Sequence, residues 1–298
     1  DGNVAVGFEA LATEDADGSN TAIGYRALKV LNAGAEGYNV AVGTDAGLSM
    51  TLGIQNTLVG NKAGDALTDA DFNVAVGRSS LTSDTLGSKS TAVGHGTLNT
   101  QNFTSATDSF NTAVGYQAGA AVTTGVQNTL IGSLAGDALT TSTSNTAVGY
   151  EALSTATTYS ENSAIGYRAL KVNTTGYSNT AVGHEAMLAN TTGISNVAVG
   201  HDAMLAATTS PSNTVIGHTS GANITTGTGE NVMVGNRAGF GVTTGAQNII
   251  IGDNACANGT MTGGQNVFIG DNAGISNTTG ATNTAVGSIS LDANTTGT

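Results

Sequence analysis

The stretch Ser144–Leu153, SNTAVGYEAL, recurs in close copies at Ser19–Leu28 (SNTAIGYRAL), Glu161–Leu170 (ENSAIGYRAL) and Ser178–Met187 (SNTAVGHEAM). The glycine of each copy belongs to a set of seventeen that close the same phrase along the chain, here called the anchor glycines. They are Gly7, Gly24, Gly43, Gly60, Gly77, Gly94, Gly115, Gly132, Gly149, Gly166, Gly183, Gly200, Gly217, Gly235, Gly252, Gly270 and Gly287. Twelve of their sixteen spacings are 17 residues, and so regular a period indicates a repeat architecture.

The residues before each anchor glycine predict a short strand. The preceding position always holds Val or Ile, and the position two before holds Ala in eleven copies and a larger apolar residue in six. β-branched residues ended by glycine are typical of a strand and a corner. A 17-residue unit has room for two short strands and two turns, and it buries an apolar face only by stacking on its neighbours. We therefore expect an all-β fold, a parallel β-solenoid (β-roll) of about 17 coils of 17 residues, with residues 1–298 as a single repetitive segment of a longer fibrous protein.

An asparagine stands four residues before the anchor glycine in sixteen copies, and Ser90 takes its place in the other. Stacked coils would bring identical amides one strand spacing apart, where they can bond along the stack. Asparagine also suits the turn that precedes a strand, so the column is structural on either interpretation. We predict an Asn ladder that includes Asn128, Asn145, Asn162, Asn179, Asn196 and Asn213.

Side-chain sizes vary together at two positions of the repeat. A large residue two before the anchor glycine goes with Gly or Cys four after it, as in Leu58 with Gly64, Leu130 with Gly136 and Ile250 with Cys256. Dense packing requires volume gained at one place to be given up nearby, so we expect the two columns to touch. The strand is also apolar on both faces. One face can fill the coil, and the other requires a partner, most simply identical chains around an axis.

The composition disfavours several classes of function. A net charge of −13 with only eight Lys and Arg is poorly suited to nucleic acid or to anionic membranes. No apolar run approaches the ~20 residues of a membrane span, so we expect no membrane insertion of this segment. No phosphate-binding loop, nucleophile elbow or isolated carboxylate pair is present, and we expect neither an enzyme nor a cofactor.

The column directly after the anchor glycine supplies the candidate binding residues. We predict a solvent-facing corner there, because the column also tolerates Phe8, Asn61 and Arg78, and this variety favours a surface ladder over a metal site. Asp253 and Asp271 in the same column are interpreted as surface carboxylates. The candidates are Tyr25, Tyr116, Tyr150, Tyr167, His184, His201 and His218, together with the inserted loops Leu31–Tyr38 and Asn99–Phe110.

The phrases NTAVGYEAL, NSAIGYRAL and NVAVGHDAM resemble the head repeats of YadA-like trimeric autotransporter adhesins, and similar runs occur in phage tail-fibre-like proteins. The resemblance covers essentially the whole chain, although the coil here is longer and prefers Ala to Ser three residues after the glycine. It implies a left-handed β-roll assembled as a homotrimer. It also implies a structural or adhesive extracellular fibre segment, the shaft or head of a surface adhesin or tail fibre, at a cell surface or on a virion. The implied partners are the chain itself and a host-cell surface glycan, protein or matrix receptor.

Two alternatives belong to other classes. An ice-binding solenoid would use the column of Thr129, Thr146, Thr180 and Thr214, although Val40, Val74, Val197 and Ile249 interrupt that column. A carbohydrate-active β-solenoid would need clustered carboxylates in a cleft, and the regular columns show no such interruption.

Overall fold

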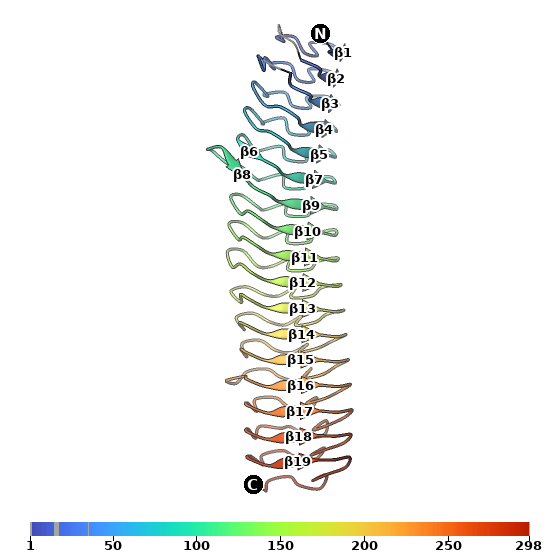
Figure 1. Cartoon of the computed structure of the whole chain (residues 1–298), viewed down its shortest axis with the longest axis vertical. Helices are drawn as coiled ribbons and strands as arrows, with labels where there is room; N and C mark the ends of the chain where they lie inside the picture. The colour runs from blue at the N-terminus through green and yellow to red at the C-terminus, as the bar shows by residue number, and fades with distance from the viewer. Residues whose placement is uncertain (1, 15–17, 35, 298) are drawn as a thin grey trace. The chain divides into compact units, whose positions relative to one another are not determined.

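The computed structural model describes residues 2–14, 18–34 and 36–297. These residues form no α-helix, and none of their segments is a helix long and apolar enough to cross a membrane. They form a parallel β-solenoid with one strand at each anchor glycine and a spacing of about 17 residues, so the prediction of an all-β parallel β-solenoid is confirmed (Figure 1). The contacts divide the chain into two compact units, Asp1–Val148 (unit 1) and Gly149–Thr298 (unit 2).

The strands are short and follow one another at the repeat period. Unit 1 contains β1 (Val4–Val6), β2 (Thr21–Ile23), β3 (Val40–Val42), β4 (Thr57–Val59), β5 (Val74–Val76), β6 (Gly87–Ser88), β7 (Thr91–Val93), β8 (Thr107–Asp108), β9 (Thr112–Val114), β10 (Thr129–Ile131) and β11 (Thr146–Val148). Unit 2 contains β12 (Ser163–Ile165), β13 (Thr180–Val182), β14 (Val197–Val199), β15 (Thr214–Ile216), β16 (Val232–Val234), β17 (Ile249–Ile251), β18 (Val267–Ile269) and β19 (Thr284–Val286).

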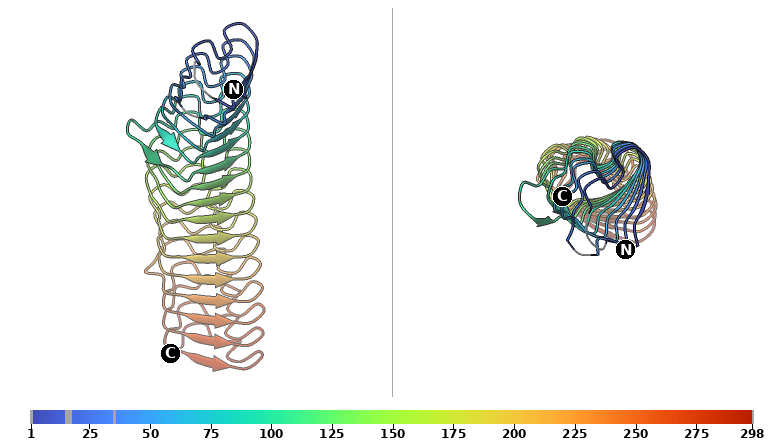
Figure 2. Two further views of the ribbon diagram at one scale, coloured as in Figure 1. Left: turned by 45° about the horizontal axis from the view of Figure 1, so that its top comes forward. Right: turned by 90° about the horizontal axis from the view of Figure 1, so that it is seen from above.

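Neighbouring strands pair in parallel with equivalent repeat positions side by side. In unit 1, Thr129 of β10 pairs with Thr146 of β11, and in unit 2 Thr180 of β13 pairs with Val197 of β14. Figure 2 shows the result within each unit, where the arrows form one wall and the turns close the coil behind it. Residues at the same position of the repeat therefore lie above one another in successive coils.

Apart from β6 and β8, which add a two-residue strand to two coils, each coil of the described residues has one strand, so the expectation of two short strands per coil is wrong. The reason is the backbone outside the strand, which is left-handed at three positions of a regular coil. In the coil of Gly183 these are Ser178, Glu185 and Met187, with φ of 55°, 52° and 52°. Such residues interrupt any extended run. The coils still stack there through backbone bonds, such as the one that the Met187 N–H donates to the Ala203 carbonyl at 3.0 Å.

The core lies on the inner side of the strands. The residue two before each anchor glycine is buried in nearly every coil, as is the residue four after it. A Cβ added to Gly136 would lie 2.7 Å from Leu130 Cδ2 of the same coil. One added to Gly47 would lie 2.7 Å from Leu28 Cδ2 of the preceding coil and 2.9 Å from Leu58 Cδ1 of the following one. The two columns that vary in size do meet, and that packing prediction is confirmed.

The anchor glycine is required for two separate reasons. Gly200 has φ +139°, a conformation that residues with a side chain rarely adopt. A Cβ there would also lie 2.4 Å from the carbonyl oxygen of Gly217 in the next coil. The close approach of the coils therefore depends on the absence of a side chain at this position.

The buried asparagines form a ladder within each unit. Asn196 Nδ2 donates to Asn179 Oδ1 at 3.2 Å and to the Ser210 carbonyl at 2.9 Å. Asn196 Oδ1 in turn accepts the backbone N–H and Nδ2 of Asn213 at 2.9 and 3.0 Å. Bonds of this kind include all six asparagines named from the sequence: Asn128, Asn145, Asn162, Asn179, Asn196 and Asn213. Each amide thus stabilises a turn of its own coil and the contact to the next.

In the one coil that has Ser90 in place of the ladder asparagine, other side chains replace the missing amide contacts. The backbone N–H of Ser90 donates to Asn73 Oδ1, and the Ser90 hydroxyl bonds the hydroxyl of Ser109 in the next coil rather than the amide of Asn111. Gln101 fills the gap, since its Nε2 donates to Ser90 Oγ and its Oε1 accepts Asn111 Nδ2, both at 2.9 Å. The ladder in unit 1 therefore continues through a side chain from a different part of the coil.

Candidate functional site

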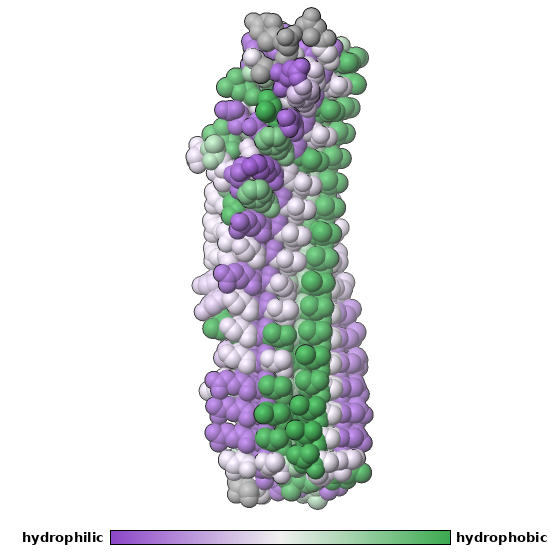
Figure 3. All heavy atoms as spheres, viewed as in Figure 1, coloured by the Kyte–Doolittle hydropathy of each residue, from purple (hydrophilic) through white to green (hydrophobic). Residues whose placement is uncertain are grey.

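The outer strand face consists of the residues three and one before each anchor glycine, whose side chains point away from the core. It is β-branched at every position except Ser163 and partly exposed throughout, with 40% of Ile165, Ile216 and Ile249 accessible. Figure 3 shows the hydrophobic strip that these side chains make along the strands of each unit. The strand thus has apolar side chains on both sides, with Thr and Ser among those of the outer side, and this outer side lacks a covering layer in the single chain.

The ring ladder consists of the seven candidate residues directly after an anchor glycine: Tyr25, Tyr116, Tyr150, Tyr167, His184, His201 and His218. All seven are exposed, so the prediction of a solvent-facing corner is confirmed. In unit 2 the last five stack in consecutive coils, with ring centroids 5.7, 5.0, 4.6 and 5.3 Å apart. In unit 1, Tyr25 stacks on Phe8 and Tyr116 on His95. The columns of the repeat therefore build a continuous aromatic edge only in unit 2.

Charged side chains flank the ring ladder at its Tyr150 end. Lys171 and Arg168 form ion pairs with Glu151. The hydrogen bond from Lys171 holds the pKa of the Glu151 carboxyl below its ordinary value. The hydrogen bond to Glu151, together with its negative charge, raises the pKa of the Tyr150 phenol. Both ion-pair partners of Glu151 are cationic, so this end of the ladder is locally neutralised.

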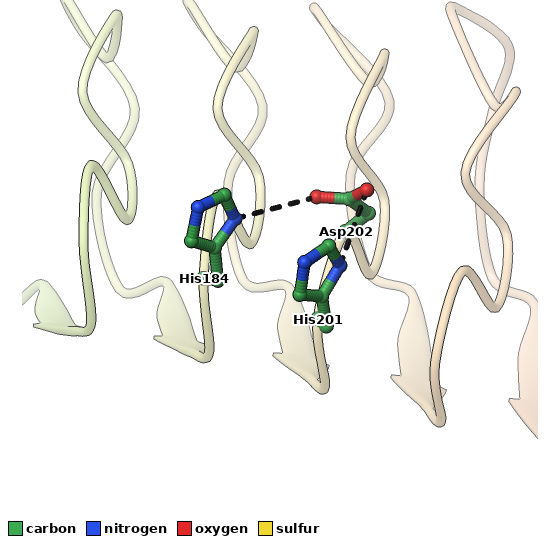
Figure 4. A group of neighbouring side chains, drawn as sticks. All are labelled: His184, His201 and Asp202. Atoms are coloured by element: carbon green, nitrogen blue, oxygen red, sulfur yellow. Dashed lines mark ion pairs between the residues drawn. The ribbon is translucent and has the colours of Figure 1, made fainter.

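His184 and His201 meet a carboxylate that the sequence analysis did not single out. Asp202 Oδ2 lies 3.2 Å from His201 Nδ1, and Asp202 Oδ1 lies 3.8 Å from His184 Nδ1 (Figure 4). The two imidazoles stack at 4.6 Å with an interplanar angle of 6°. About half of each histidine side chain is exposed, whereas the Asp202 side chain is 23% exposed.

The general bonding of the coil explains why Asp202 lies beside both rings. The backbone N–H two residues after an anchor glycine donates to the carbonyl directly after the preceding anchor glycine, and the Asp202 N–H does so to His184 at 2.9 Å. A side chain at that position therefore lies next to ring-ladder residues of two coils. This rule would have placed Asp202 from the sequence, had the backbone bonds been known.

His218 and the two candidate carboxylates Asp253 and Asp271 have no bond to Asp202 among the described residues. His218 Nδ1 lies 3.2 Å from Asn236 Oδ1, and Asp253 accepts a hydrogen bond from Asn236 Nδ2 at 2.8 Å. Asp253 and Asp271 are exposed, in agreement with their interpretation as surface carboxylates.

The inserted loops take different forms. Loop Asn99–Phe110 contains β8, which pairs with β6 as a small separate sheet. Of the loop Leu31–Tyr38, Ala35 lies outside the described residues. The surface of the described residues has no pocket. The candidate contacts are thus ladders and loops on an open surface.

Neither a family model nor a curated protein matches the chain.

Proposed function

We propose that this chain is a structural or adhesive segment of an extracellular fibre, the shaft or head of a surface adhesin or of a phage tail fibre. In this proposal copies of the chain associate through the outer strand face, most simply as a left-handed homotrimer. The ring ladder and the loops then stay outside, where they present a binding surface to a glycan, a protein or a matrix receptor.

The observation that carries the proposal is the partly exposed apolar strip on the outer strand face. A strand of three residues is ~10 Å long and neighbouring strands are ~4.8 Å apart, so each coil offers about 50 Å² of this face. Seventeen such coils offer about 800 Å² per chain, which is the area that one partner contributes to a standard specific interface. The area grows with each coil, so a repeat protein can reach a stable assembly without any single strong contact.

The test is the mass of the chain in solution, measured by light scattering after size-exclusion chromatography. A trimer at micromolar concentration is expected, and the pair Ile165→Lys with Ile216→Lys should shift it to monomer. Lysines at Thr192 and Thr226 are the matched control, because those residues are exposed in turns of the same unit. A monomeric wild-type chain, or equal dissociation by both pairs, would refute the proposal.

A second candidate, ice binding, is favoured by the threonines on the same face. Thr91, Thr112, Thr129 and Thr146 occupy four neighbouring strands of the main sheet in unit 1 and are partly exposed. Hydroxyl and methyl groups repeated at a fixed strand spacing can order a layer of water. The same face cannot both contact ice and be buried between copies of the chain.

Thermal hysteresis distinguishes the two candidates. The fibre proposal predicts no gap between melting and freezing points for the assembled chain. A gap that disappears when Thr112 and Thr129 are both changed to Lys, in a chain shown to be monomeric, would establish the second candidate.

A further inference from the structure

We propose that His184, His201 and Asp202 bind a divalent transition-metal ion of the Zn²⁺ type on the surface of unit 2. The donor atoms are one imidazole nitrogen from each histidine and a carboxylate oxygen, and such atoms all lie within 4.8 Å of one another. This group is separate from the outer strand face, so the proposal is independent of the proposed assembly.

The backbone already holds the three side chains in one place. His184 and His201 are equivalent residues of adjacent coils, and the bond from the Asp202 N–H to the His184 carbonyl fixes the aspartate beside both. Figure 4 shows the carboxylate facing the Nδ1 edge of each ring. A site formed on stacked coils loses little conformational freedom when an ion arrives.

The charges around Asp202 set it apart from its equivalents in other coils. Four other carboxylates stand two residues after an anchor glycine, and each forms an ion pair with Lys or Arg. They are Glu9, Asp45, Glu151 and Glu185. Among the described residues Asp202 has only the two imidazoles as ion-pair partners.

A second observation points to a ligand at the same carboxylate. Asp202 Oδ1 is buried and accepts no hydrogen bond in the described structure. A buried carboxylate oxygen without a donor is unfavourable, because it has lost its hydrogen bonds to water and has gained none in the protein. A cation at the Nδ1 edges of the two rings, where the carboxylate lies, would bind this oxygen and one nitrogen of each histidine at the same time.

The mixture of donors selects the kind of ion. Two nitrogens and one oxygen suit Zn²⁺ and its neighbours in the transition series, whereas Ca²⁺ and Mg²⁺ prefer oxygen alone. Zinc lies ~2.0–2.1 Å from imidazole nitrogen, so the two Nδ1 atoms must turn toward each other. Both rings are half exposed and can rotate to do so, and solvent can take the remaining coordination position.

The experiment is calorimetric titration of the full chain with Zn²⁺ alone. Asp202→Asn and His201→Tyr are conservative variants, since the chain itself has Asn254 and Tyr167 at the equivalent positions. His218→Tyr is the matched control, because it keeps the ring stack and lies one coil beyond the proposed ligands. Each ligand variant should weaken zinc binding at least ~100-fold, and the control should leave it unchanged.

The outcome is checked by a second readout, the visible absorption bands of bound Co²⁺, which report nitrogen and oxygen ligation directly. One ion per chain, lost in both ligand variants and retained in the control, supports the site. Unchanged affinity in Asp202→Asn, equal loss in the control, or binding weaker than millimolar would overturn it. Circular dichroism of each variant establishes that the solenoid is intact.

Discussion

Removal of one amide from the Asn ladder tests the forces that hold the coils together. Asn196→Ala deletes the acceptor of the Asn213 backbone N–H and the donor to the Ser210 carbonyl, both in buried surroundings. Each buried group left without a partner costs about 1–3 kcal/mol, so the two together cost about 2–6 kcal/mol. The Asn213 side chain loses less, because its Nδ2 keeps Pro211 O and Ser210 Oγ as acceptors. We expect a loss of about 4 kcal/mol in the free energy of unfolding.

Two assays measure this loss. Urea unfolding followed by circular dichroism gives the change in stability, and hydrogen exchange follows the Asn213 amide itself. A loss of 4 kcal/mol corresponds to about 10³-fold faster exchange through opening of that region. Asn223→Ala is the control, because Asn223 is exposed and donates one bond, to the Phe240 carbonyl, so its loss should be within about 0.5 kcal/mol. If Asn196→Ala were no more destabilising than Asn223→Ala, the ladder would be a by-product of turn geometry and the reasoning would fail.

Three further outcomes follow from the packing. Gly200→Ala should lower the free energy of unfolding by about 3 kcal/mol or more. Gly287→Ala should lower it less, because Gly287 has a similar φ of +131° but nothing lies closer than 4.0 Å to its added Cβ, so only the backbone conformation is strained. The urea midpoints of the two variants give the comparison. Leu130→Ala and Gly136→Leu should each lower the free energy of unfolding by about 2–4 kcal/mol, and the double variant should lose much less than the sum of the two. A double-mutant cycle that shows the two losses to be additive would contradict their contact. Burial raises the pKa of the Cys256 thiol to about 12, so a thiol reagent at pH 8 should modify it only after unfolding; rapid reaction of the native chain would show that the thiol is accessible.

The period of the anchor glycines was enough to predict the fold class, the strand register and the partners of the Asn ladder. The size relation between Leu58 and Gly64 was enough to predict a core contact, because dense packing links the volumes of touching residues. Both inferences depend only on which residues occupy equivalent positions of the repeat. Equivalent residues lie above one another in a stack of coils, whatever path the backbone takes between the strands.

The path of the backbone between the strands could not be predicted from the sequence. Residues such as Arg26 and Leu28 adopt φ of 54° and 48°, a left-handed conformation that their side chains do not favour and no local pattern announces. Tertiary bonds between coils impose it. The same left-handed backbone brings Asp202 close to His184. The sequence therefore failed to predict the candidate metal site for the same reason that it wrongly predicted a second strand.

A second row of amides, buried at Asn173, Asn190 and Asn277, was missed as well. Asn190 Nδ2 donates to Asn173 Oδ1 at 2.7 Å, and Asn294 Nδ2 donates to Asn277 Oδ1 at 3.2 Å. These asparagines belong to the NTTG turns, where the residue type alone is explained by the turn. Only the backbone trace shows that successive turns lie over one another.

The bonding of each coil to the coil one period away has a mechanical consequence. Each coil inside a unit is held by its two neighbours alone, so a force applied to the chain ends would peel the unit one coil at a time. Each step would release 17 residues, which span ~60 Å when extended and occupied ~5 Å of the stack, and so lengthen the chain by about 55 Å. Such a segment would lengthen under force in many small, equal unfolding steps, and each step would dissipate part of the mechanical energy.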